Sequence, residues 1–255
     1  MRRCCSALPA RIRAHRVLGV IPVAHISISD LTVEFAIFGS NARSLKNNIL
    51  SQATGGRIMT GAHDVVTVRA IDKLSLEIKD GDRIGIIGHN GSGKSTLLRV
   101  LAGIYKPTAG KITVEGDIST LLDPITGMDM EATGYENIFL RGHLLGMSTS
   151  SIRSTIDDIA SFTELGDFLS LPLKTYSSGM IARLAFAIST ARTSDILLID
   201  EGIGAGDATF QQKAEDRISN LFAKTSIILI ASHSEQLLSH FCNRRIEMER
   251  GKLIG

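Results

Sequence analysis

The sequence is poor in the features that stabilise small secreted proteins or cross membranes. It has three cysteines among 255 residues: Cys4 and Cys5 are adjacent, and the third is Cys242. Three cysteines so placed cannot form a disulfide framework or a zinc knuckle, which favours a reducing compartment. No uninterrupted apolar run approaches the roughly 20 residues that cross a bilayer. Any role at a membrane therefore requires a partner protein.

Basic residues are also scarce once the N-terminal segment is set aside. The first 29 residues hold five arginines and no acidic residue, whereas the remainder holds 23 basic and 26 acidic residues. A slightly acidic body argues against a nucleic-acid-binding protein, which would present a basic face. We expect residues 1–25 to be a disordered basic leader without an assigned role, and residues 26–255 to form a single domain.

From residue 26 the hydrophobic pattern becomes regular. Alternating apolar residues predict strands over 26–35, 65–68 and 74–78. Between the first two strands lies an irregular insertion, within which residues 44–50 have the spacing of a short amphipathic helix. Further along, residues 226–231 form a continuous apolar run that predicts a buried strand of an α/β sheet.

The strongest motif is a glycine-rich run that follows a short apolar strand at residues 83–87. Its residues are Gly88, His89, Asn90, Gly91, Ser92, Gly93, Lys94, Ser95 and Thr96. This strand–loop–helix context is the one in which the pattern binds nucleotide phosphates. Glycine lets successive backbone N–H groups point at a phosphate, a path that a Cβ at Gly88 or Gly93 would obstruct. We expect Lys94 to reach the β- and γ-phosphates and the Ser95 hydroxyl to bind Mg²⁺.

Two polar strand ends complete the predicted nucleotide site. The apolar run that begins at Asp195 delivers Asp200, predicted to hold Mg²⁺ through water, and Glu201, predicted to accept a proton from the attacking water. Adjacent acids can also be plain surface charges, but the phosphate loop about a hundred residues upstream favours the functional interpretation. His233 follows the strand at 226–231, where α/β sheets bind ligands, and is predicted to hydrogen-bond the γ-phosphate.

A Ser-Ser-Gly turn opens an apolar helix that the spacing predicts over residues 179–191. Its residues, Ser177, Ser178 and Gly179, offer backbone N–H groups suited to an anion. Taken alone, the turn is equally an ordinary capped helix. Because the phosphate loop already supplies an anion site, the turn suggests an active site that a second copy of the chain completes.

The order of these four motifs is that of the ATP-binding cassette (ABC) ATPases, which the chain resembles from residue 26 to residue 255. A narrower similarity is to the ATPase subunits that export bacterial cell-surface polysaccharides such as O-antigen and capsule. Tyr-Ser-Ser-Gly-Met replaces the commoner Leu-Ser-Gly-Gly-Gln, a change typical of that branch. The segments that carry this similarity are Arg43-Ser44-Leu45-Lys46, Thr133-Gly134-Tyr135-Glu136-Asn137-Ile138, Lys174-Thr175-Tyr176-Ser177-Ser178-Gly179-Met180, Arg183-Leu184-Ala185-Phe186-Ala187 and Gly206-Asp207-Ala208-Thr209-Phe210.

The resemblance implies an α/β P-loop NTPase core of the RecA-like type, with an antiparallel β subdomain and a helical subdomain inserted at about 133–173. It implies ATP and Mg²⁺ as cofactors and a homodimer that sandwiches two ATP molecules. Each nucleotide would lie on Lys94, Ser95 and Thr96 of one chain and under Ser177, Ser178 and Gly179 of the other, with Asp207 in a dimer-contacting loop.

The resemblance also implies an integral membrane permease as partner, a lipid-linked polysaccharide as cargo and a place on the cytoplasmic face of the bacterial inner membrane. Two positions depart from the superfamily pattern. Asp123 stands near the place of a usual glutamine that contacts the γ-phosphate, and Val66 stands near the place of the aromatic residue that stacks on adenine. Phe35 and Phe38 are the alternative aromatic residues.

Other functions stay open at this point. An importer ATPase would share every general motif and lack only the Tyr-Ser-Ser-Gly-Met and Thr-Gly-Tyr-Glu-Asn segments that match the polysaccharide branch. A soluble ABC ATPase that remodels ribosomes or DNA generally carries two cassettes or long coiled-coil insertions, which this sequence does not display. A small-molecule kinase would need neither Ser177 nor His233.

Overall fold

The computed structural model describes residues 23–37, 58–60, 66–200 and 208–254. Several expectations therefore lie outside the described residues: most of the leader, the short helix at 44–50, Phe38, and the site residues Glu201 and Asp207. Among the described residues, no helix combines the length and the apolar character needed to cross a bilayer.

An antiparallel sheet of four strands forms one layer. Its strand order is β2 (Ile58–Thr60), β3 (Val66–Lys79), β1 (His25–Ile37) and β5 (Ala109–Glu115). The expectation of two separate strands at 65–68 and 74–78 was wrong, because β3 continues through both. Between them, Ile71 pairs with Val33 of β1 and Arg69 pairs with Glu34, to which it is also ion-paired at 2.8 Å.

A second sheet of six strands positions the nucleotide motifs. Its order is β10 (Lys252–Ile254), β9 (Arg244–Glu249), β4 (Arg83–Ile87), β8 (Ile227–Ala231), β7 (Ile196–Ile199) and β6 (Ile118–Leu121). The pairs from β9 to β6 are parallel, and β10 returns antiparallel to β9. The carboxyl ends of β4, β7 and β8 thus meet at one edge, which is where such sheets bind ligands.

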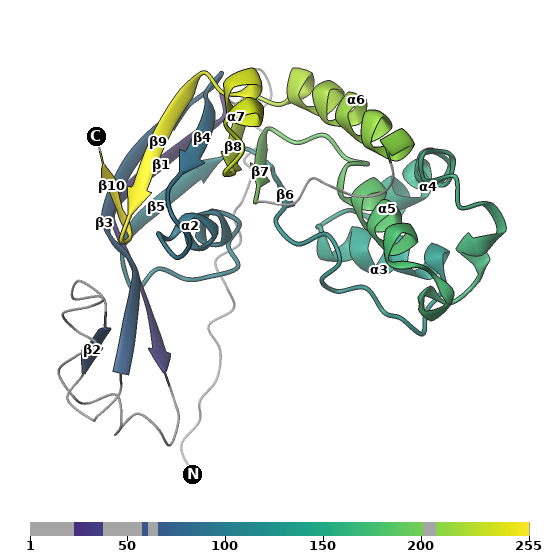
Figure 1. Cartoon of the computed structure of the whole chain (residues 1–255), viewed down its shortest axis with the longest axis horizontal. Coiled ribbons are helices and arrows are strands. Elements are labelled where there is room, and N and C mark those ends of the chain that lie inside the picture. The colour runs from purple at the N-terminus through teal and green to yellow at the C-terminus, as the bar shows by residue number, and fades with distance from the viewer. Residues whose placement is uncertain (1–22, 38–57, 61–65, 201–207, 255) are drawn as a thin grey trace, which may run out of the picture.

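Both faces of this sheet are covered, which explains the continuous apolar runs in β7 and β8. Ile196 and Leu198 pack on the face that holds α2 (Lys94–Leu101) and the four-stranded sheet. The alternate residues Leu197 and Ile199 pack on the other face, against α6 (Ala208–Lys224) and α7 (Glu235–Phe241). In Figure 1 the strands of the two sheets overlap, and α2 is seen below them.

A helical unit lies to one side of the sheets (Figure 1), and Phe186 packs in one hydrophobic cluster with Leu197 and Ile199 of the six-stranded sheet. It comprises α3 (Gly134–Leu144), α4 (Thr149–Thr163), the short 3-10 helices η2 (Gly166–Ser170) and η3 (Leu173–Thr175), and α5 (Ser178–Ser189). These elements share a hydrophobic cluster of their own, in which Leu184 and Ile188 of α5 are buried. The unit therefore extends beyond residue 173 and includes the helix that follows the Ser-Ser-Gly turn.

The helix ends follow from local sequence. Thr133 and Glu136 form a capping box at the start of α3: Oγ1 of Thr133 accepts from the Glu136 N–H at 3.2 Å, and a Glu136 carboxylate oxygen accepts from the Thr133 N–H at 2.8 Å. Ser177 caps α5, its Oγ accepting from the Met180 N–H at 3.2 Å. Gly103, with φ of +74°, follows the C-cap of α2.

Candidate nucleotide site

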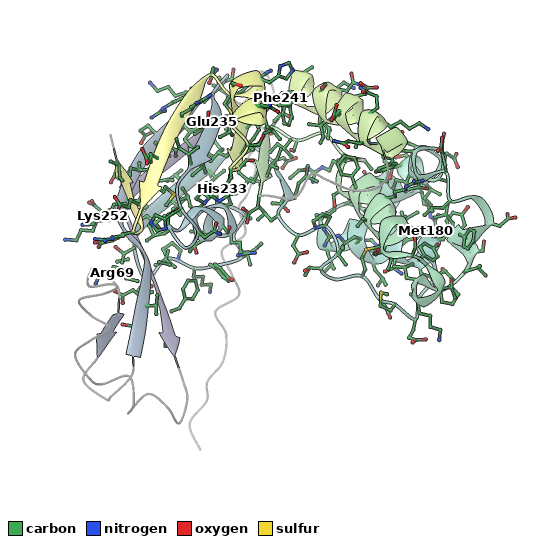
Figure 2. All side chains as sticks on the ribbon, in the orientation of Figure 1. Arg69, Met180, His233, Glu235, Phe241 and Lys252 are labelled. Carbon is green, nitrogen blue, oxygen red and sulfur yellow. The ribbon has the colours of Figure 1, made fainter. Side chains whose placement is uncertain are left out.

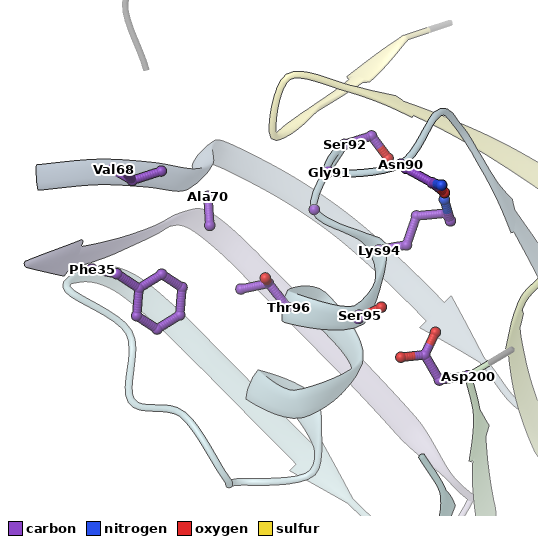
Figure 3. A pocket seen from close by; sticks show the side chains of 11 residues that line it. Phe35, Val68, Ala70, Asn90, Gly91, Ser92, Lys94, Ser95, Thr96 and Asp200 are labelled. Atoms are coloured by element: carbon purple, nitrogen blue, oxygen red, sulfur yellow. The ribbon is translucent and has the colours of Figure 1, made fainter. Parts of the chain in front are cut away.

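A pocket of about 550 Å³ opens where β4 turns into α2. Residues 90–96 of the phosphate loop line it together with Phe35, Val68, Ala70 and Asp200. In Figure 3, Phe35 lies at one end of this pocket and Asp200 at the other, with the first turn of α2 between them. The structure therefore brings together the loop and one of the two predicted acids.

The phosphate loop depends on glycine for two different reasons. Gly88, Gly91 and Gly93 have φ of +148°, +76° and +113°, values that other residues rarely adopt. At Gly88 a Cβ would collide with the carbonyl oxygen of Met248, and at Gly93 it would lie 2.7 Å from the carbonyl oxygen of Ala70. At Gly91 it would meet no atom within 4 Å. The loop is thus pressed against neighbouring backbone at both of its ends.

That neighbouring backbone belongs partly to the C-terminal hairpin β9–β10, which the sequence reasoning missed. The Gly251 N–H donates to the Ser92 carbonyl at 2.8 Å, and the Gly251 carbonyl accepts from the Asp72 N–H at 2.9 Å. Gly251 has φ of +79°, and a Cβ there would lie 2.6 Å from the Ala70 oxygen. A glycine between two short strands signals a turn, but only the fold shows that this turn supports the loop.

Lys94 and His233 meet at the mouth of the loop. The ammonium of Lys94, a residue only 6% exposed, donates to the Gly88 carbonyl at 2.6 Å and to the His89 carbonyl at 3.3 Å. His233 is exposed, and its Nε2 lies 3.0 Å from Oδ1 of Asn90 and 3.5 Å from Nζ of Lys94. His233, which is predicted to contact the γ-phosphate, thus already contacts residues of the phosphate loop.

Asp200 and Ser95 face the same part of the pocket (Figure 3). Asp200 follows β7, is 9% exposed, and donates its N–H to the Leu121 carbonyl of β6 at 3.4 Å. No group of three or more His, Cys, Asp or Glu residues that could hold a metal ion occurs in the described part of the chain. Mg²⁺ needs no such cage, because it is usually bound by one or two carboxylates together with substrate phosphates.

Ser177, Ser178 and Gly179 lie outside this pocket. They begin α5 in the helical unit, and Figure 1 shows α5 well separated from α2. In Figure 2 the same separation is visible between Met180, next to the turn, and His233 at the nucleotide site. Ser177 and Ser178 are exposed. Within one chain, the turn therefore cannot contact a ligand held by the phosphate loop.

The structure also shows the surroundings of the two positions that depart from the superfamily pattern. Phe35, 37% exposed, lines the nucleotide pocket and contacts Tyr105 edge-on with ring centroids 5.1 Å apart. On the facing strand it is Val68 that lines the pocket. Asp123 lies two residues beyond β6 and borders a different cavity, and its carboxylate accepts a hydrogen bond from the Thr126 hydroxyl.

A parallel sheet, a phosphate loop between strand and helix, and an acidic residue at the end of another strand of the same sheet define a P-loop nucleoside triphosphatase. The sequence also matches the profile of the ABC transporter family over residues 71–204. This chain belongs to the ABC transporter family.

Its relatives cover most of the chain. The O-antigen export system ATP-binding protein RfbE of Yersinia enterocolitica is 48% identical over 222 residues, which are 87% of this chain and 93% of the relative. The ABC transporter protein AbcA of Aeromonas salmonicida is 36% identical over 90% of this chain and 71% of its own length. The teichoic acids export ATP-binding protein TagH of Listeria monocytogenes is 35% identical over 89% of this chain and 65% of its own length.

Solved structures share the fold at low identity. An ATP-binding cassette in a dimeric, post-hydrolysis state with ADP and Pi superposes with a TM-score of 0.64 at 19% identity, covering 90% of this chain and 97% of the other. The ATP-binding subunit of another ABC transporter gives a TM-score of 0.66 at 16% identity, covering 91% of this chain and 88% of the other. The expected fold class is confirmed.

Proposed function

We propose that this chain is the ATP-hydrolysing subunit of an ABC exporter that moves a cell-surface polysaccharide of the O-antigen or capsule type across the inner membrane. The observation that carries the proposal is the 48% identity to an O-antigen export ATP-binding protein over 87% of this chain and 93% of that relative. A match of that extent covers the helical unit as well as the phosphate loop. It therefore supports a shared transport role beyond nucleotide binding.

ATP fits the pocket because the loop offers what a polyphosphate needs. Backbone N–H groups of a glycine-rich loop at a helix N-terminus bind phosphate oxygens. Ser92 is fully buried, and its Oγ has no hydrogen-bond partner among the described residues. Lys94 carries three ammonium donors, which can exchange the Gly88 and His89 carbonyls for the β- and γ-phosphates.

The oxygen ligands near the proposed position of the phosphates also fit Mg²⁺. The Ser95 hydroxyl and the Asp200 carboxylate would hold it together with the phosphates, as hard oxygen ligands. When bound, the ion neutralises the charge that develops between the β- and γ-phosphates. Glu201, next in sequence to Asp200, accepts a proton from the attacking water, and His233 donates a hydrogen bond to the γ-phosphate.

Adenine stacks on Phe35. The ring lies on the pocket wall at the end away from Asp200, which is where a nucleotide whose phosphates occupy the loop places its base. Tyr105 supports the ring edge-on. Phe35, one of the two alternative aromatic residues in the sequence, thus takes the role that the superfamily pattern gives to an aromatic residue near Val66.

A second copy of the chain completes each site. Because Ser177 and Gly179 lie outside the pocket of their own chain, they contact ATP only across a head-to-tail dimer. The turn lies at the N-terminal, positive end of the 12-residue helix α5, a position that favours an anion. Asp207 contributes to the loop between the two chains.

The membrane partner is a permease with cytoplasmic helices. Exposed apolar side chains of Ile104 and Leu144, 59% and 66% exposed, border a cavity of about 470 Å³ between the sheets and the helical unit. A groove of this kind takes the apolar face of a helix. The chain then works at the cytoplasmic face of the inner membrane, and the polysaccharide passes through the permease.

Gene deletion with complementation tests the export claim. The deletion strain should keep its polymer inside the cell and lose it from the surface, and a plasmid with the wild-type gene should restore it. The matched control is the Lys94→Ala gene, which should be expressed equally and restore nothing. Normal surface polysaccharide in the deletion strain would remove the claim, and loss of a nutrient uptake instead would indicate an importer.

A further inference from the structure

The segment that follows β6 is tied to the helical unit by one buried cation. Arg141, on α3, is only 7% exposed. Its guanidinium donates from Nη1 to the Thr126 carbonyl and from Nη2 to the Asp123 carbonyl at 3.1 Å. Nη2 also lies 3.5 Å from Oγ of Ser189, the last residue of α5. One side chain thus joins three segments that are far apart in sequence.

Each of those segments leads to a part of the proposed composite site. Residues 123–126 begin two residues after β6, whose Leu121 pairs with Ile199 and accepts from the N–H of Asp200. At its other end, α5 begins with the turn that contains Ser177 and Gly179. Arg141 therefore connects the acidic strand end of one chain to the turn that the same chain presents to its partner.

The burial of the charged Arg141 side chain is energetically unfavourable. Desolvation lowers its pKa, and the Asp123 carboxylate opposes that shift only in part. Its Nε has no hydrogen-bond partner among the described residues, and leaving a buried donor unpaired costs stability. An apolar side chain would fill the space without these costs, but it could not hold two carbonyls. A feature of this kind calls for an explanation.

We propose that Arg141 is a positioning residue: it fixes residues 123–126 against the end of α5 and so sets where Ser177 and Gly179 stand relative to Asp200. This inference rests on the proposed ATPase function. The planar guanidinium matters because its two Nη groups reach two carbonyls, whereas a lysine has one terminal nitrogen. A displacement of about 1 Å at a reacting centre lowers rates by about 10²-fold.

The variants are Arg141→Gln, Arg141→Lys and, as a matched control, Arg153→Gln. Arg153 is an exposed residue of α4, so its variant removes a positive charge from the helical unit without cutting the ties to 123–126. On the purified full chain, ATP-binding stoichiometry and Kd are measured together with kcat. Arg141→Gln should bind one ATP per chain with an unchanged Kd and lose about tenfold or more of kcat.

Arg141→Lys should lie between wild type and Arg141→Gln, and Arg153→Gln should match wild type. Loss of ATP-binding sites in proportion to kcat, in Arg141→Lys as well as Arg141→Gln, would show a mere folding role and overturn the inference. So would an unchanged kcat in Arg141→Gln.

Hydrogen exchange separates this inference from the proposed function. Without nucleotide, amides of 123–128 and 185–190 should exchange about tenfold faster in Arg141→Gln than in wild type, and those of 94–101 should not change. Exchange rates in Arg141→Gln that equal those of wild type in all three segments would overturn the positioning role. A wild-type chain without ATPase activity would instead remove the proposed function, and the exchange data would still decide on Arg141.

Discussion

Gly93→Ala and Gly91→Ala form a matched pair of changes within one loop. Both glycines have positive φ, so alanine is strained at either position by about 1–2 kcal/mol. Both changes also reduce the freedom of the unfolded chain equally, an effect that cancels in the comparison. Only at Gly93 does the new Cβ lie 2.7 Å from a backbone oxygen, that of Ala70, whereas at Gly91 no atom lies within 4 Å. Overpacking of this kind costs about 1–3 kcal/mol more.

The difference is measurable as a thermal shift. For a domain of this size, each kcal/mol lowers Tm by about 2–4 °C. Gly93→Ala should therefore unfold about 2–12 °C below Gly91→Ala in a circular dichroism melt, and it should lose most of its ATP affinity because the first turn of α2 is displaced. Equal midpoints and equal ATP affinities for the two variants would refute the account of how the loop is held.

Three further predictions concern single side chains. Glu201→Gln should bind ATP as wild type does and hydrolyse it about 10²-fold or more slowly in a phosphate-release assay, since it removes the proton acceptor; unchanged turnover would contradict that role. Phe35→Ala should weaken ATP binding about tenfold in a fluorescence titration, because one base stack is lost, whereas Phe35→Tyr should bind ATP as wild type does. An ATP affinity of Phe35→Ala equal to that of wild type would place adenine elsewhere. Burial raises the pKa of Cys242 to about 11, so at pH 8 its thiol is protonated and unreactive. In a chain with Cys4→Ser and Cys5→Ser, a maleimide should then label Cys242 far more slowly in the native state than in urea, and similar rates would contradict its burial.

The core of the fold could be predicted from sequence because its signals are local. The apolar run before Asp200 and the glycine-rich loop after residue 87 each fix the type of their element, and Ser177 predicted the start of α5 to within a residue. Strand boundaries were less accessible. β3 was expected as two strands because Arg69 and Asp72 interrupt its apolar pattern, and only the pairing with Glu34 across β1 shows why the strand tolerates Arg69.

Long-range contacts limited the prediction of the site. Gly251 and Met248 press on the phosphate loop from a hairpin about 160 residues away in sequence, and their local pattern indicates only a turn. Phe35 could be placed in the pocket only once β1 was seen beside β3. Arg141 is buried although arginine is a residue type usually found at the surface, so its identity gives no sign of its burial. Each of these residues acts through the packing of segments that the sequence does not relate.

The central claim is that ATP is held between two copies of this chain, and its most direct test is the mass of the Glu201→Gln protein with and without ATP. Light scattering should show one chain without ATP and two with it. The same protein carrying Ser177→Arg should bind ATP on its phosphate loop and remain a single chain, because the larger side chain prevents the turn at 177–179 from contacting the ATP of the partner chain. A mass that ATP does not change, or a dimer that Ser177→Arg leaves intact, would contradict the shared site.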